Sequence, residues 1–438
     1  MANQKVIVVG AGMAGLAAAY RLRQAGVDVT VLESSDHVGG RLVTDSRDGY
    51  LIERGAQLIT STYRNALGLV KELGLEAELR PTSPWMAIVK NGRPRRMPSG
   101  AMFPIYVLTT GLVSLPDLAR FIWHTTKLKW PLVDNYAAWA EYDDEDTARW
   151  CAPRLGHATD YLVEPLVAGG LLQTMEETSR AATLATLALT DNGRSKEMTL
   201  SRGMGSLPET LASKVTVKLE SPVQAVEVRD DGAVVQLSGE QLRADHVVLA
   251  ATAPIASRLY RGGDEIERRL MATEYAPTVK IGLATSRHWR NEPALKNVWG
   301  FMIPRPDRQL VASATLESAK DIARVPDGEM LNLFVKSEAA GAMMDLSDDE
   351  IVAKVLPDIE RFFPGATATK RFAQVVRWPH ALPKSPVGRS RDLAEYRKSR
   401  PPSRRVLLAG DYMGLLHFES AIETGIWAAD QIIQQPNP

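Results

Sequence analysis

The sequence predicts an α/β protein, with α+β character when the whole chain is considered. Three observations support this prediction. The chain opens with an apolar run, a glycine-rich turn, an alanine- and leucine-rich stretch and a second apolar run, which is the order strand, turn, helix, strand. Strand-like runs return in the middle of the chain and near its end. Between these returns lie one stretch that favours helices and one that favours strands, so we expect a mixed architecture.

Composition limits the kinds of partner. The chain has 438 residues, of which 45% are hydrophobic and 24% charged, as is typical of a soluble protein with about two to three domains. Lys+Arg and Asp+Glu both number 52, so no net charge favours nucleic acid or an anionic membrane. There is one cysteine, Cys151, and the seven histidines include no close-spaced pair and no HExxH motif. Neither an internal disulfide nor a metal site is therefore expected.

We expect a cytoplasmic protein without a membrane-spanning helix. No secretory signal pattern precedes the first apolar run, and a single cysteine fits a reducing compartment. The most apolar later stretch, residues 103–115, is interrupted by a proline and a glycine and is far shorter than the roughly 20 residues that span a membrane. Residues 118–130 could lie on a membrane surface, although inward packing of Phe121, Ile122 and Trp123 is the favoured interpretation.

Residues 5–33, "KVIVVGAGMAGLAAAYRLRQAGVDVTVLE", predict one strand–helix–strand unit of the Rossmann type. Gly10 makes the tight turn, Gly12 allows the backbone to approach a pyrophosphate, and Gly15 allows the helix to pack closely on the strand. The helix N-terminus presents free N–H groups to the phosphates. The predicted dinucleotide contacts in this unit are Gly10, Gly12, Met13, Ala14 and Gly15.

The end of the second strand narrows the choice of dinucleotide. Glu33 lies 18 residues after Gly15, where a carboxylate can accept hydrogen bonds from the adenosine ribose. An acid at this place argues against the 2′-phosphate of NADP and leaves NAD and FAD. A second glycine pair, Gly39 and Gly40, is followed by Arg41. This second loop favours FAD, because it offers another backbone approach and a fixed cation to the same pyrophosphate.

A further motif identifies a family. Together with "GYLIERGAQLIT" at residues 49–60, the two glycine loops resemble the flavin-containing amine oxidase superfamily, which includes monoamine oxidases, protoporphyrinogen oxidases and phytoene desaturases. The resemblance implies that Gly40 and Arg41 hold FAD. It also implies that a short segment lies close to the flavin, namely Gly55, Ala56 and Gln57.

The middle of the chain follows the order of elements in this superfamily. Residues 201–214 predict a glycine loop that leads into a helix, and the residues after them predict strands joined at an Asp-Asp-Gly turn. The resemblance implies that the backbone at Val223 contacts the adenine.

The end of the chain, residues 404–433, predicts a strand, a turn and a helix. A carboxylate at a strand end can hold ribitol hydroxyls, and a helix N-terminus can hold a flavin carbonyl. We therefore expect Gly410 and Asp411 at the ribitol, and the amides near Ala421 and Ile422 at the flavin ring.

The resemblance implies two discontinuous domains with the reaction cleft between them. The FAD-binding domain is expected to comprise residues 1–85, 200–271 and 395–438. The substrate-binding domain is expected to comprise residues 86–199 and 272–394, with a mostly helical part at about 112–199 that resembles protoporphyrinogen oxidases. Cys151 lies in the helical part, so the covalent cysteinyl link of monoamine oxidases has no residue here, and FAD is expected to be non-covalent.

Three side chains are candidates for the chemistry at the flavin. Lys280 lies in an otherwise apolar strand, where an ammonium group needs a polar partner; amine oxidases of the superfamily have a lysine in a similar strand that is linked to the oxygen reaction. A solvent-facing lysine on an edge strand is the alternative. His417 aligns with an aromatic residue of many amine oxidases, and could act as a base or hydrogen-bond donor or be structural. Trp378 could pack near the ring system or belong to the core.

The leading prediction is an FAD-dependent oxidase that removes a hydride from a carbon next to, or conjugated with, nitrogen and passes the electrons to O2 to give H2O2. The alternative is a protoporphyrinogen oxidase-like or desaturase-like enzyme for a bulky apolar ring or polyene, which the middle third favours. A third possibility is a flavin-binding protein without turnover. Expected partners are a small-molecule substrate and O2 but no nucleic acid, while peripheral membrane contact and oligomeric state stay open.

Overall fold

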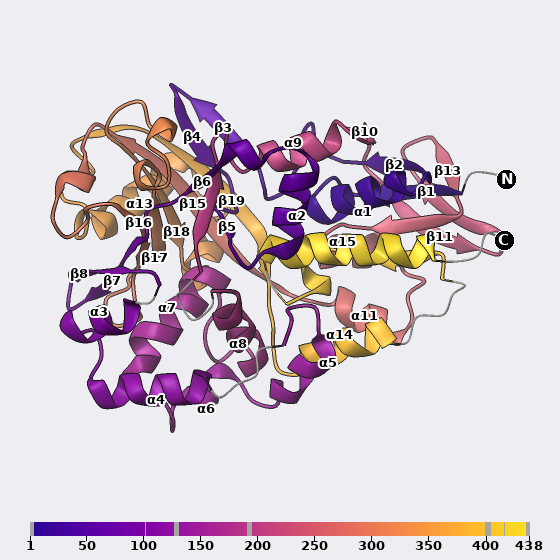
Figure 1. Ribbon diagram of the computed structural model, residues 1–438. Helices are drawn as coiled ribbons and strands as arrows, with labels where there is room; N and C mark the ends of the chain where they lie inside the picture. The colour runs from indigo at the N-terminus through magenta and orange to yellow at the C-terminus, as the bar shows by residue number, and fades with distance from the viewer. Residues whose placement is uncertain are drawn as a thin grey trace.

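The computed structural model describes residues 4–100, 102–126, 131–190, 195–398, 404–415 and 417–434. Its two main sheets are one parallel sheet and one mixed sheet, and helices lie between and around them (Figure 1). The predicted α/β class is confirmed.

The five-stranded parallel sheet gathers strands from distant parts of the chain. Its strands in spatial order are β10 (Thr216–Lys218), β2 (Asp28–Leu32), β1 (Lys5–Val9), β14 (His246–Leu249) and β20 (Val406–Leu408). All neighbouring pairs are parallel. Interior strands of such a sheet are buried on both faces, which explains why β1 and β14 are almost continuous runs of valine, isoleucine and leucine.

The first and last long helices lie side by side on this sheet, as Figure 1 shows for α1 (Met13–Gln24) and the yellow α15 (His417–Ile433). Small residues permit the close approach, since a Cβ on Gly425 would lie 2.0 Å from the carbonyl oxygen of Ala14. Gly15 brings α1 equally close to β1, because a Cβ there would lie 1.9 Å from the carbonyl oxygen of Gly10. This agrees with the packing role expected for Gly15.

Replacing Gly425 with Ala should therefore lower the free energy of unfolding by about 1–3 kcal/mol, because the helices must separate to admit the methyl group. Gly68 in α2 (Arg64–Glu72) is the matched control, since a Cβ there meets nothing within 4 Å. Gly68→Ala should raise stability by about 0.5–1 kcal/mol through helix propensity alone. Urea unfolding of both variants measures the difference, and equal shifts in the two would contradict the packing argument.

Small antiparallel sheets and further helices surround the two main sheets. The sheets are β11 (Ala225–Arg229) with β12 (Gly232–Gln236) and β13 (Gln241–Ala244); β3 (Thr44–Arg47) with β4 (Tyr50–Glu53); and β5 (Ile59–Thr60) with β9 (Glu197–Leu200) and β6 (Leu79–Pro81). The helices are α9 (Ser206–Ala212), α10 (Ala253–Leu259), α11 (Glu265–Met271) and α14 (Arg389–Lys398). The predicted Asp-Asp-Gly hairpin, β11 to β12, and the predicted glycine-loop helix, α9, are both confirmed.

A seven-stranded mixed sheet forms the other half of the molecule. Its strands in spatial order are β19 (Lys370–Pro383), β15 (Tyr275–Thr285), β18 (Glu329–Val335), β17 (Val311–Leu316), β16 (Val298–Met302), β7 (Trp85–Lys90) and β8 (Arg93–Pro98). Two helices, α12 (Ser337–Ala340) and α13 (Asp348–Glu360), contribute to the apolar core on one face. Strands β7 and β8 form an antiparallel hairpin. The division into two discontinuous domains stays a prediction. It is compatible with the two main sheets because, apart from Trp85 at the start of β7, each takes its strands from the residue ranges predicted for one domain.

The stretch between β8 and β9 is mostly helical and lies along the lower part of the view in Figure 1. It contains α3 (Phe103–Thr109), α4 (Leu115–Thr126), α5 (Tyr136–Trp139), α6 (Thr147–Cys151), α7 (Glu164–Leu166) and α8 (Arg180–Leu189), with π-helical turns at Thr159–Val163 and Val167–Leu171. Cys151 is buried in α6.

The expected packing of α4 is wrong in part. Phe121 is buried, but Ile122 and Trp123 are 39% and 58% exposed, because these two neighbours point away from the face that carries Phe121. Residues 127–130 of the same stretch lie outside the described residues. In the described part of the chain, no helix combines the length and the apolar character needed to cross a membrane.

Candidate active site

A cavity of about 1230 Å³ opens between the carboxyl ends of the parallel strands and one face of the seven-stranded sheet. Most of the residues predicted to bind cofactor or take part in catalysis line it. These are Gly10, Gly12, Met13, Ala14, Glu33, Gly40, Arg41, Gly55, Ala56, Gln57, Val223, Trp378, Gly410, Asp411, His417 and Ala421. Gly15, Lys280 and Ile422 are the predicted residues outside its lining.

The two glycine loops lie against each other at one end of the cavity. Gly10 has a φ of +104°, and a Cβ there would lie 2.8 Å from the carbonyl oxygen of Ala250, so the turn requires glycine. A Cβ on Gly12 would meet nothing within 4 Å, whereas one on Gly40 would lie 3.5 Å from the Cα of Gly12. The backbone therefore forms an open cradle at Gly12, of the kind that a pyrophosphate fills.

Glu33 is fixed at the edge of this cradle by main-chain groups. Its Oε2 accepts a hydrogen bond from the amide of Ala11 at 2.7 Å, and its Oε1 accepts one from the amide of Ser35 at 2.9 Å. Oε1 also accepts from the hydroxyls of Ser34 and Ser35, whereas Oε2 has a second lone pair for a further donor, and Glu33 lines the cavity. The arrangement fits the ribose contact expected of Glu33.

Arg41 and Asp411, which are predicted to contact different parts of FAD, form an ion pair. Nη1 of Arg41 lies 2.5 Å from Oδ2 of Asp411 and also donates to the carbonyl of Ala381 at 2.7 Å. The Tyr275 hydroxyl donates to Oδ1 of Asp411 at 2.8 Å. Burial disfavours the charged guanidinium, but the attraction of Asp411 outweighs it and raises the pKa of Arg41. The pair ties the second glycine loop to the C-terminal turn.

The segment expected near the flavin ring packs on the main-chain carbonyl of Arg41. A Cβ on Gly55 would lie 2.1 Å from the carbonyl oxygen of Arg41, and the amide of Ala56 donates to the same oxygen at 3.2 Å. Gln57 turns its Nε2 back to the carbonyl of Gly55 at 2.7 Å. Only glycine fits at position 55, because its α-carbon packs directly against the main chain of Arg41.

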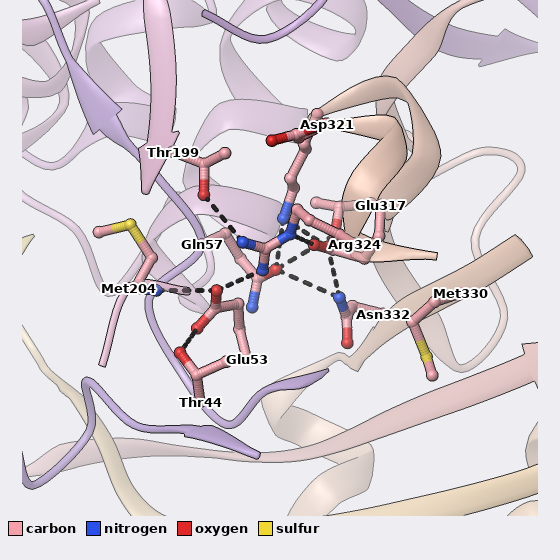
Figure 2. A network of polar contacts seen from close by, with 12 residues as sticks. Thr44, Glu53, Gln57, Thr199, Met204, Glu317, Asp321, Arg324, Met330 and Asn332 are labelled. Carbon is pink, nitrogen blue, oxygen red and sulfur yellow. Dashed lines mark hydrogen bonds and ion pairs between the residues drawn. The ribbon is translucent and has the colours of Figure 1, made fainter. Parts of the chain in front are cut away.

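Figure 2 shows the buried polar network behind this segment. Arg324 pairs with Glu53 and, at 2.7 Å, with Glu317. Lys320 pairs with Glu317 at 2.6 Å and donates to Oε1 of Gln57 at 2.7 Å. Burial alone would raise the pKa of Glu317, but the two cations lower it to about 2. Glu317 is therefore ionised at neutral pH, and the network holds the side chain of Gln57 in the cavity wall.

Lys280 joins this buried region instead of facing solvent. It lies in β15, which pairs with β18 on one side and β19 on the other, and it is fully buried. Its Nζ donates to the main-chain carbonyl of Glu53, just before Arg54 and Gly55, which line the cavity. Burial lowers the pKa of Lys280 to about 7, while Glu317 and Glu53 oppose the shift. The edge-strand alternative is therefore wrong.

Trp378 and His417 both stand in the cavity wall. The indole Nε1 of Trp378 donates to the carbonyl of Arg54 at 2.8 Å, so it also holds the segment that is expected to lie at the flavin. His417 has a φ of +67°, and its ring centroid is 6.3 Å from that of Tyr63. Burial lowers the pKa of His417 to about 4, so its imidazole is neutral at pH 7 and acts as a neutral donor or acceptor.

The start of the last helix differs from the prediction. Helix α15 begins at His417, and the unpaired amides of a helix belong to its first turn. Ala421 and Ile422 lie in the next turn, and Ile422 is fully buried. The amides that could meet a flavin carbonyl therefore lie nearer to His417 and Phe418 than the sequence suggested.

Comparison with known proteins decides the family. Residues 13–433, nearly the whole chain, match the family described as flavin containing amine oxidoreductase. The chain belongs to this family.

The flavin-containing amine oxidoreductases similar to this chain have different substrates. A coproporphyrinogen III oxidase of Bacillus subtilis (strain 168) is 25% identical over 99% of this chain and 96% of its own length. A putrescine oxidase of Kocuria rosea is 30% identical over 52% of this chain and 50% of its own length. The crystal structure of a putative protoporphyrinogen oxidase from Exiguobacterium sp. 255-15 superimposes with a TM-score of 0.77 at 21% identity and covers all of both chains. Membership makes this protein a flavin-dependent oxidoreductase.

Sequence reasoning missed several buried charged residues of this oxidoreductase. Glu317, Lys320 and Arg324 follow one another at intervals of three and four residues in "ESAKDIAR", a spacing that places them on one face of a helical turn. The same pattern describes an exposed charged segment, so it gives no sign of burial. Glu197 of β9, which also lines the cavity, had no sequence signal at all.

Proposed function

We propose that this oxidoreductase binds FAD non-covalently and oxidises an amine at the carbon next to nitrogen, with O2 as the electron acceptor. The open cradle at Gly12, the fixed carboxylate of Glu33 and the size of the cavity fit FAD. Cys151 does not line the cavity, and burial raises the pKa of its thiol to about 12, so it is unsuited to a covalent link. Bound FAD supplies an electrophilic N5 that accepts a hydride.

The observation that carries the proposal is the placement of Lys280. Its Nζ donates a hydrogen bond to the main-chain carbonyl of Glu53, next to the segment expected at the flavin ring. With a pKa of about 7, the group is part protonated at neutral pH and can stabilise negative charge that develops when electrons pass to O2. The lysine in this strand favours an amine oxidase over a porphyrinogen oxidase.

Replacing Lys280 with Met should slow the reoxidation of the reduced protein by at least about tenfold, because a fixed positive charge is lost from the site. In the wild-type protein the rate should fall as the pH rises through about 7, since the charged form of Lys280 disappears there; in Lys280→Met this dependence should vanish. Stopped-flow mixing of the photoreduced protein with O2 measures both rates without any substrate. FAD content should stay unchanged, and an unaltered rate would rule out this role.

The second candidate is oxidation of a porphyrinogen, which is favoured by the similarity to coproporphyrinogen III oxidase along nearly the full length. The state of the arginines in the cavity wall argues against it. Three of the four arginines that line the cavity, Arg41, Arg54 and Arg377, each pair with an aspartate, at 2.5, 2.8 and 2.6 Å. The fourth, Arg258, forms no ion pair among the described residues, so the carboxylates of a tetrapyrrole would find one unpaired arginine and would have to compete for the other three.

An anaerobic screen tests the proposed function directly. The yellow protein is mixed with amines, porphyrinogens or isoprenoids, and the flavin absorbance is followed. Bleaching by amines supports the proposal, and bleaching only by porphyrinogens or isoprenoids supports the second candidate. A protein that no substrate class bleaches would be a flavin-binding protein without turnover.

A cytoplasmic location and peripheral membrane contact stay proposals. Membrane contact is supported by the exposed side chains of Ile122 and Trp123, which follow Phe121, a residue of the cavity lining.

A further inference from the structure

We infer that Glu197 is the subsite that binds the positively charged nitrogen of the substrate, and that the substrate is a monoamine with an apolar body. The inference rests on the proposed function, because it names the group that recognises the amine. Glu197 is not among the predicted site residues, and it lies in β9, the middle strand of a small sheet in which it stands directly opposite Thr60 of β5.

Only one of the two carboxylate oxygens of Glu197 has a hydrogen-bond partner among the described residues. Its Oε1 accepts a hydrogen bond from the Ser195 hydroxyl at 2.6 Å. Its Oε2 is buried and has no hydrogen-bond partner among the described residues. Glu197 is part of the cavity lining, together with Thr60, Tyr63 and His417. A carboxylate oxygen in such a place needs a donor, and the cavity is where a ligand can supply one.

No cation of the described chain neutralises this carboxylate. No Lys, Arg or His within the described ranges forms an ion pair with Glu197. His417, which lines the same cavity, is neutral at pH 7 because burial lowers its pKa to about 4. Burial raises the pKa of Glu197 to about 7, and only the Ser195 hydrogen bond opposes the shift. A bound ammonium group would provide both the missing donor and the missing charge. Its proton can then pass to the carboxylate of Glu197, whose pKa is about 7, so that the nitrogen lone pair is free when the hydride leaves the adjacent carbon.

The rest of the wall defines what the ammonium group is attached to. Three carboxylates line the cavity, and Glu33 and Asp411 belong to the glycine cradle and the Arg41 pair. Glu197 is left as the acid available to a substrate cation, so a diamine would leave its second charge without a partner. The remaining lining is largely apolar and includes Met86, Ile88, Phe103, Leu166, Leu172 and Trp299. A bulky hydrocarbon or aromatic body with one amine matches this wall.

Two probes of the same shape separate charge from shape. In 2-phenylpropan-2-amine the carbon that bears nitrogen has no hydrogen, so the amine cannot be oxidised there; 2-phenylpropan-2-ol is its uncharged counterpart. At pH 8 the holoprotein should bind the amine at least about tenfold more tightly than the alcohol, as expected for a charged hydrogen-bonded pair. Titration of the flavin absorbance, checked by calorimetry, measures both affinities.

Glu197→Gln keeps the shape of the side chain and should reduce this preference to less than about threefold, while the alcohol binds as before. Glu209→Gln, the same change at an exposed position on α9, should keep the wild-type preference. Glu197→Asp keeps the charge and should retain part of the preference. This variant still tests the role of the charge if Glu197→Gln fails to bind FAD. Putrescine should compete with the amine probe at least about tenfold less well than a phenylalkyl monoamine.

The inference is wrong if the wild-type protein binds the amine and the alcohol equally, or if Glu197→Gln keeps the full preference. It is also wrong if putrescine competes as well as the monoamine. Neither probe is turned over, so the first two outcomes do not depend on catalysis. A protein that prefers the amine probe but is bleached by no amine would refute the proposed function and leave the cation subsite intact.

Discussion

Replacing Arg324 with Met is expected to lower the free energy of unfolding by about 3–5 kcal/mol, the cost of breaking a buried ion pair by removing one partner. Arg324 is fully buried and contacts both Glu53 and Glu317. Attraction to these acids raises the pKa of Arg324 in spite of its burial. Without it, Lys320 alone remains in an ion pair with Glu317, while Glu53 loses its ion-pair partner among the described residues.

The measurement is urea unfolding followed by tryptophan fluorescence, with FAD present in excess for every variant. Arg229→Met is the matched control, because Arg229 pairs with Glu227 on a surface hairpin where both side chains are more than half exposed. An exposed pair contributes at most about 1 kcal/mol. A loss of stability no larger than that of the control would show that the Glu53–Arg324–Glu317 network is not what holds the two acids in the core.

The sequence predicted those parts of the site that local backbone geometry dictates. Gly10 predicts a tight turn and Gly12 predicts a backbone that a phosphate can approach, whatever surrounds them. Glu33 follows a strand whose length is set by the same motif. The resemblance to a known family then extended the site to Asp411. For these residues the signal lies within a few positions of the residue itself.

Other features depend on contacts between distant segments and could not be predicted from one sequence. Glu197 meets Thr60 across a short strand pair, and Glu53 meets Arg324 from 271 positions away. Lys280 looked unusual because a charge interrupted an apolar strand, but its partner is a main-chain carbonyl, which carries no sequence signal. Inward packing of Ile122 and Trp123 was wrong for a related reason, since helical periodicity does not say where the neighbouring surface ends.

Removing the carboxylate of Asp411 is expected to weaken FAD binding by at least about tenfold, because a hydrogen bond to a charged group contributes about 1.5–3 kcal/mol. Asp411→Ala removes the carboxylate that we propose binds the ribitol. It also removes the ion pair with Arg41 and the hydrogen bond from Tyr275. Glu33→Ala should lower FAD content by removing the partner of the ribose. The ratio of flavin to protein absorbance after purification, and titration of the apoprotein with FAD, give the loss.

The argument for Asp411 depends on separating its contact with the ligand from its contacts with the chain. Tyr275→Phe removes one hydrogen bond to Asp411 but leaves the carboxylate and Arg41 in place, so it should reduce FAD affinity far less than Asp411→Ala. Asp430→Ala breaks a surface ion pair between α15 and Arg21 of α1, and should leave FAD content unchanged. If Asp411→Ala and Glu33→Ala both kept full FAD occupancy, the two ends of the proposed FAD site would be wrongly assigned, even though the cavity between them remained.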